Sequence, residues 1–140
     1  MLRLEPVYQS DCFKIEADHK YGVLRTEWLQ TAVNDQELMN SGVRLNECIS
    51  NSNITKVLSN AQQLGSISSK AKDWLSSSFY DELSKLGVVK FARVLPSNLF
   101  SKLALESVIT RAEALGCIGF EVKNFGEEKA AVEWLLTNGQ

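Results

Sequence analysis

The fold is decided by one stretch of the chain, Val88-Val89-Lys90-Phe91-Ala92-Arg93-Val94-Leu95-Pro96-Ser97-Asn98. Residues 88–95 form the most apolar segment of the sequence and show no clean alternation of apolar and polar residues, which is typical of a strand covered on both faces. Pro96 ends this strand, and Ser97 and Asn98 cap a long helix that ends at Gly116. The helical spacing predicts an inward-facing stripe on that helix, made of Leu99, Phe100, Leu103, Ala104, Val108, Ala112 and Leu115.

Shorter elements are predicted on both sides of this stretch. Apolar residues alternate with polar ones over residues 13–17, and a turn then leads to a second apolar run, so these segments predict a hairpin. The other strands are predicted at residues 23–29, 54–59 and 118–123. Helices are predicted to begin at Asn34, where Glu37 completes a capping box, near Ser68, at Asn98 and at Glu127.

The order of these elements predicts the fold class. After the hairpin, strands and helices alternate, and right-handed crossovers then give an α/β domain with a mostly parallel sheet and helices on its faces. The 140 residues fit one domain, expected at residues 1–140, because no repeat or linker interrupts them.

Composition and charge exclude some classes of function. The formal net charge is −2 and the isoelectric point about 5.5, which argues against a general nucleic-acid binder. No apolar run approaches the roughly 20 residues that span a bilayer. The N-terminus, Met1 to Pro6, lacks the features of a signal peptide, so we expect a cytoplasmic protein without a transmembrane segment.

No catalytic set is recognisable, so the sequence does not predict an enzyme. His19, the only histidine, is predicted in a turn, and no Gly-x-Ser-x-Gly elbow is present. Cys12, Cys48 and Cys117 are too far apart for a familiar zinc set and are expected to be reduced thiols, with no metal site. The Gly-rich phosphate-binding motifs are also missing, so no cofactor is predicted.

A few polar residues are candidates for binding. Gly65 precedes a serine-rich helix start, at which an anion or phosphorylation is one interpretation and simple capping by serine is the favoured one. Arg93 places a cation in an apolar strand, where it either binds an anionic group or, as we favour, pairs with a carboxylate. Glu127 and Glu128 are expected to be solvated residues that complement a helix dipole.

The layout resembles the SpoIIAA-like branch of the STAS-type domains over roughly residues 12–136. The resemblance rests on Trp74-Leu75, on residues 87–96, and on the ending Phe125, Glu127-Glu128 and Ala131-Val132-Glu133-Trp134-Leu135. It implies a mixed sheet of about five strands with four helices packed against it, and a binding or regulatory role. Regulated members carry a phosphorylated serine in an Asp-Ser-Ser-Gly turn after the third strand. Here residues 60–69 match that position, with Asn60 near the place of the acidic residue and Ser66 or Ser68 near that of the serine, and the Asp-Ser-Ser-Gly pattern is missing.

Two functions follow as hypotheses. The first is a non-enzymatic binding or regulatory module that takes a protein partner or a small ligand. Its recognition end would be formed by residues 60–69 and 96–98, because ligands of open α/β sheets bind beyond the carboxyl ends of the strands. The second is a small-molecule or lipid carrier, or an enzyme with an unfamiliar site, which needs a pocket of about 300 Å³ or more. A homodimer is left open. The candidate site residues are Asn60, Ser66, Ser68, Ser69, Arg93, Ser97 and Asn98.

Overall fold

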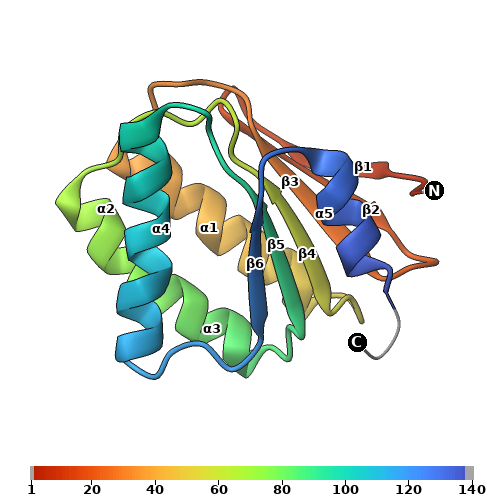
Figure 1. The fold of residues 1–140 in the computed structure, drawn as a ribbon. Coiled ribbons are helices and arrows are strands. Elements are labelled where there is room, and N and C mark those ends of the chain that lie inside the picture. The colour runs from red at the N-terminus through yellow and green to blue at the C-terminus, as the bar shows by residue number, and fades with distance from the viewer. Residues whose placement is uncertain (1, 138–140) are drawn as a thin grey trace.

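Six strands form one sheet in the computed structural model, which describes residues 2–137 (Figure 1). They lie side by side in chain order, with antiparallel pairing from β1 to β3 and parallel pairing from β3 to β6. The strands are β1 (Glu5–Gln9), β2 (Phe13–Asp18), β3 (Val23–Trp28), β4 (Lys56–Asn60), β5 (Lys90–Val94) and β6 (Glu121–Phe125). The α/β class, the hairpin and the mostly parallel sheet are therefore confirmed.

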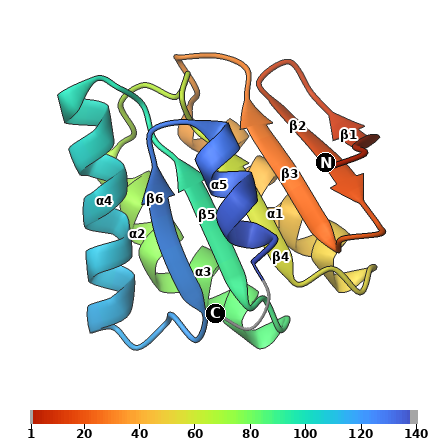
Figure 2. The same ribbon diagram turned by 45° about the vertical axis from the view of Figure 1, so that its right-hand side comes forward.

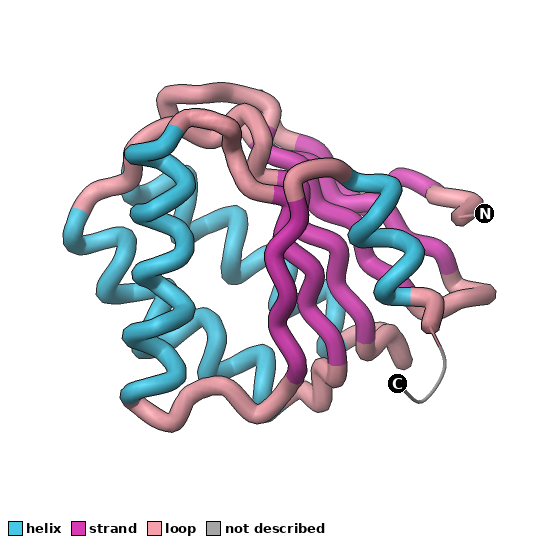
Figure 3. The backbone as a smooth tube through the Cα atoms, viewed as in Figure 1, coloured by secondary structure: helices cyan, strands magenta, loops and turns pink. Residues whose placement is uncertain are grey.

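The helices cover both faces of this sheet. Figures 1 to 3 show α5 alone on one face and the other helices together on the opposite face. The segment from α2 to α3 is one continuous helix with a π-helical turn, η1, in its middle, so the described chain has four helices as predicted. The helical elements are α1 (Asp35–Ser50), α2 (Ser69–Trp74), η1 (Leu75–Phe79), α3 (Tyr80–Lys85), α4 (Leu99–Ala114) and α5 (Glu128–Leu135).

Helix starts follow the predicted caps. Asn34 and Glu37 form a reciprocal capping box at the start of α1. The Ser68 hydroxyl accepts the Ala71 N–H at the start of α2, and the Asn98 side chain accepts the Ser101 N–H at the start of α4. The sequence therefore located these starts because capping depends on neighbouring residues alone.

Residues 2–137 form three apolar clusters. Two lie on opposite faces of the sheet, and the third consists of Ala61, Leu64, Leu95 and Leu105. The larger core lies under the helices α1 to α4 and includes Phe91 of β5. The smaller core lies under α5 and consists of the buried residues Val23, Leu58, Ala92, Val94, Ala131 and Leu135. Every residue of β5 is buried, which confirms a strand covered on both faces.

The sheet has one strand more than the resemblance implied. This strand is β1, which pairs antiparallel with β2 at the sheet edge, and the sequence analysis did not predict it. Four of its five residues are exposed, so it lacks the apolar alternation that marks a half-buried strand. The last strand, β6, also begins later than predicted, at Glu121.

The predicted buried face of α4 is wrong. The helix buries Ser101, Leu105, Val108, Ile109 and Ala112, whereas Leu99, Phe100, Leu103 and Leu115 are exposed. Apolar residues occur around the whole circumference of α4, so helical periodicity does not single out one face. Val108 and Ala112 belong to both stripes. Tertiary packing decides which stripe is buried, and in the folded protein it is the one that includes Ser101.

No helix in the part of the chain that the structure describes is long and apolar enough to cross a membrane.

Gly42 allows α1 to approach the aromatic side chains of the next helix. A Cβ atom built on Gly42 would lie 2.7 Å from the Trp74 ring and 3.1 Å from Phe79. We expect Gly42→Ala to lower the free energy of unfolding by about 1–3 kcal/mol, because overpacking outweighs the better helix propensity of alanine.

Gly126 provides the matched control, because a Cβ atom there meets nothing within 4 Å. Gly126→Ala should stay within about 0.5 kcal/mol of the wild type in denaturant unfolding. Equal stability of the two variants would contradict this account of the helix contact.

Candidate functional site

The loops that follow β4 and β5 lie next to each other at the carboxyl ends of the parallel strands, at the top of Figure 1. One surface hollow of about 540 Å³ is lined by residues of both loops, among them Gln62, Ser66, Ser97 and Asn98. A second hollow of about 440 Å³ shares Gln62 and Ser97 and reaches β6. We call these two hollows and the loops around them the recognition end.

The candidate residues divide between this end and the protein interior. Ser66, Ser97 and Asn98 line the hollow between the loops. Ser68 caps α2 and donates a hydrogen bond to Asp35, so it has the structural role that the sequence favoured, and the exposed Ser69 opens the same helix.

An apolar patch adjoins the recognition end. Its members are Leu99, Phe100 and Leu103 on the first turns of α4, with 62%, 80% and 51% of their surfaces exposed. Phe100 also lines the hollow between the two loops. We call these three residues the α4 patch. Exposed side chains of this size in one group are a common mark of a binding surface.

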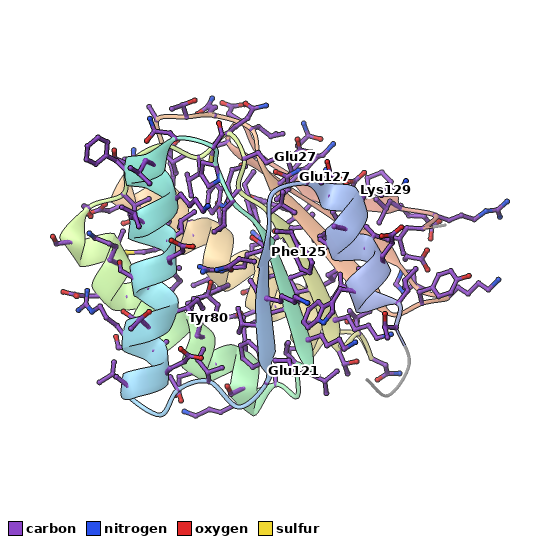
Figure 4. All side chains as sticks on the ribbon, in the orientation of Figure 1. Glu27, Tyr80, Glu121, Phe125, Glu127 and Lys129 are labelled. Carbon is purple, nitrogen blue, oxygen red and sulfur yellow. The ribbon has the colours of Figure 1, made fainter. Side chains whose placement is uncertain are left out.

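A charged network lies on the face of the sheet that α5 covers, beneath the start of that helix. Arg25 of β3 donates hydrogen bonds to Glu128 at 2.9–3.1 Å, to Glu16 at 2.8 Å and to Glu27 at 3.0 Å. Asn60 donates to the same Glu128 carboxylate at 2.9 Å. Figure 4 labels Glu27 of β3, which in this view lies next to Glu127 at the start of α5. The network joins β2, β3, β4 and α5.

Burial and pairing act against each other in this network. Burial alone would raise the pKa of Glu128, but hydrogen bonds from Arg25 and Asn60 outweigh it and hold that pKa below its ordinary value. Burial likewise lowers the pKa of Arg25, and its hydrogen bond with Glu128 more than restores it. Both groups therefore stay charged at neutral pH and hold α5 to the sheet.

Two sequence interpretations need correction here. Glu128 is half-buried and ion-paired rather than solvated, while Glu127 is exposed as expected. Asn60 is buried and binds Glu128 and Gln62, so it lies beneath α5 rather than at the surface of the loop. Arg25 is not among the residues that the sequence predicted for a site. The hairpin register, which pairs Arg25 with Glu16 and Glu27 with Lys14, was the available signal.

The other end of α5 is held by a second buried cation. Lys90 of β5 donates to the carbonyl oxygens of Trp134 and Thr137, each at 3.1 Å, and its ammonium lies 4.9 Å from the centre of the Trp134 ring. A cation is favourable at this end because the helix dipole places negative charge there.

Arg93 has no carboxylate partner among residues 2–137, so the favoured salt bridge was wrong. Its side chain points away from α5, into the larger core, and Arg93 is only 3% exposed. Nε donates to Asn124 at 3.0 Å and Nη1 donates to the Leu105 carbonyl at 2.7 Å. Arg93 therefore lies inside the protein, beneath the recognition end, whose second hollow is lined by its partner Asn124.

Among the remaining chemistry-bearing residues, His19 and Cys48 line one surface hollow together with Arg44 and Glu47. His19 lies exposed in the β2–β3 turn, as predicted, and the three cysteines are free, with Cys12 buried. Within residues 2–137, no group of three or more His, Cys, Asp or Glu side chains could share a metal ion.

Comparison with protein-family models, with curated proteins and with solved structures found no match for this chain.

The ion pair between Glu128 and Arg25 should make the stability of the folded protein depend on pH. Because its pKa is lowered in the folded protein, Glu128 contributes stability above its ordinary pKa of about 4.3, and that contribution is lost as the pH falls through the folded value. We expect Glu128→Gln to be less stable than the wild type at pH 7, with a difference that closes below about pH 4.3.

The neighbouring Glu127 offers a matched control, because it is exposed and makes no side-chain cap to α5. Chemical unfolding at a series of pH values should give Glu127→Gln a stability curve parallel to that of the wild type. A constant difference between wild type and Glu128→Gln down to pH 2.5, where carboxylates are largely protonated, would contradict the ion-pair account.

Proposed function

We propose that this chain is a non-enzymatic binding or regulatory module of STAS-like type, which takes a protein partner at its recognition end. The observation that carries the proposal is the α4 patch, three large apolar side chains exposed together beside the polar hollow between the loops. Apolar anchors surrounded by polar groups are the common composition of a protein-binding surface.

The composition of the surrounding surface supports a protein partner. The hollows beside the α4 patch combine apolar side chains with side-chain amides and hydroxyls, and Lys102 and Glu106 carry opposite charges. Such a surface has hydrogen-bonding groups without a strong single-sign charge, which suits a neutral or mixed protein surface better than a polyanion.

The strand-end position also supports this assignment. The loops that carry Ser66 and Ser97 follow adjacent parallel strands, where binding residues of open α/β sheets gather. Loops held by a rigid sheet can vary without disturbing the core, so a recognition surface there is compatible with the fold.

The geometry gives less support to a lipid or drug-sized ligand inside the protein. The internal cavity of the larger core measures about 50 Å³, well below the roughly 300 Å³ that a drug-sized ligand takes. The hollows of the recognition end are on the surface and have a mixed polar and apolar lining.

Phe100→Ser tests the proposal, because Phe100 is 80% exposed and its loss should leave folding intact. We expect affinity capture from native cell extract to recover a specific partner with the wild type and to lose it with this variant, with affinity lowered about tenfold or more.

Val89→Ser is the matched control, because Val89 is 51% exposed and precedes β5, at the opposite end of that strand from the recognition end. It should retain the partner. A partner kept by Phe100→Ser, or lost equally with both variants, would contradict the proposal. A wild type that dimerises in gel filtration while Phe100→Ser stays monomeric would instead assign the α4 patch to self-association.

A further inference from the structure

A cavity of about 50 Å³ lies between the sheet and the helices that cover the larger core. Most of its lining is apolar, from residues such as Phe13, Leu38 and Leu105. Its polar lining residues all come from the central strands and the helix above them, and they are Thr26, Ser59, Tyr80 and Arg93. The cavity is thus an apolar space with a few converging polar groups, the usual composition of a small-ligand site.

Arg93 brings an unpaired donor to this cavity. Two of its nitrogens are satisfied by Asn124 and Leu105, but Nη2 is buried without a hydrogen-bond acceptor among the described residues. Both existing acceptors are neutral, so the buried positive charge has no negative partner in that part of the chain. A buried charge of this kind is costly unless an anion pairs with it.

Tyr80 contributes a second polar group beside Arg93. Figure 4 labels Tyr80 between α4 and the sheet, and Tyr80 and Arg93 both line the cavity. Burial raises the pKa of Tyr80, against the opposing effect of the Arg93 charge. The phenol is therefore neutral at physiological pH and can donate a hydrogen bond, while it supplies no charge to Arg93.

The helix above the cavity departs from regular α-helical geometry at this point. Leu75 and Phe79, the first and last residues of the π-helical turn η1, both line the cavity. Gly42 of α1 lines it as well. Single π-helical turns inside α-helices occur frequently at functional sites.

We propose that this cavity binds a small monocarboxylate, whose oxygens accept hydrogen bonds from Arg93 Nη2 and whose short tail lies among the apolar lining residues. One water needs roughly 10–15 Å³ of such space, so the cavity has room for an anion of only a few non-hydrogen atoms. A single cation matches a single negative charge, and the apolar lining favours a carboxylate with a short alkyl tail over a phosphate. The cavity lies beneath the recognition end, since Leu64 and Leu95 line both the cavity and the hollows above it, but the proposal does not depend on the function proposed there.

Side-chain NMR of the wild-type protein tests the proposal directly. The Arg93 guanidinium signal, assigned through its own side-chain carbons, is followed while acetate or propionate replaces chloride at constant ionic strength. We expect this signal to shift in a saturable manner, with no saturable shift on addition of octanoate, which exceeds the cavity. An Arg93 signal that does not move, or that moves linearly like those of exposed arginines, would overturn the proposal.

Two variants separate the site from general charge effects. Binding to the variants is followed through the methyl signals of Leu38 and Leu105, which line the cavity. Arg93→Met should weaken acetate binding about tenfold or more, because it removes the charged donor. Ala61→Val keeps the charge but adds methyl groups to a residue that lines the cavity, and it should also weaken binding. Arg111→Met is the control, because Arg111 lies on the exposed side of α4 and pairs with Asp73.

The control variant should bind acetate like the wild type. Binding retained in both Arg93→Met and Ala61→Val would overturn the proposal, because the anion would then lie elsewhere. If either cavity variant fails to fold, the wild-type titration still decides the question.

Discussion

A sheet covered on both faces removes its central side chains from water, and this constraint governs the charged residues of the protein. Arg25, Lys90 and Arg93 all lie on the covered strands β3 and β5 and are all buried. Each must find its partners inside the protein, because desolvation disfavours an unpaired charge. The three cations find different partners, and two of them hold α5 to the sheet while the third does not.

Arg25 and Lys90 meet the requirement through α5. Arg25 binds Glu128 at the start of this helix, and Lys90 binds backbone carbonyls at its end. The helix is short, at eight residues, and helices of this length are unstable in isolation. Its attachment therefore depends on these two cations together with the apolar residues between them. Arg93 projects to the other face, where no carboxylate of residues 2–137 pairs with it, so the same constraint leaves the buried charge on which the proposed carboxylate site rests.

Local features of the sequence were enough to predict much of the fold. The caps at Asn34, Ser68 and Asn98 depend on residues within one helical turn. The continuous apolar run at β5 indicates by itself that the strand is buried on both faces. The strand β1 and the buried face of α4 could not be predicted in this way, since both depend on tertiary packing. The exposed position of Leu99, Phe100 and Leu103, which carries the proposed function, became visible only once the packed face of α4 was known.

The candidate site was predicted only in part, because some of its features follow from local sequence and others depend on tertiary contacts. The loops after β4 and β5 do meet at one edge, which follows from parallel strand order alone. The roles of Asn60, Glu128 and Arg93 were misjudged, because each depends on a residue far away in the chain. Arg25 donates hydrogen bonds to Glu128, which lies 103 positions further along the chain, and no pattern in the sequence joins the two residues.

The contrast between the two arginines is most directly tested by comparing the unfolding free energies of Arg25→Met and Arg93→Met. We expect Arg25→Met to lose about 1–3 kcal/mol, because it leaves the carboxylates of Glu16, Glu27 and Glu128 close together without their cation. Arg93→Met should be as stable as the wild type or more stable when no carboxylate is added, because it removes a buried charge without a negative partner. A loss in Arg93→Met as large as that in Arg25→Met would contradict the account.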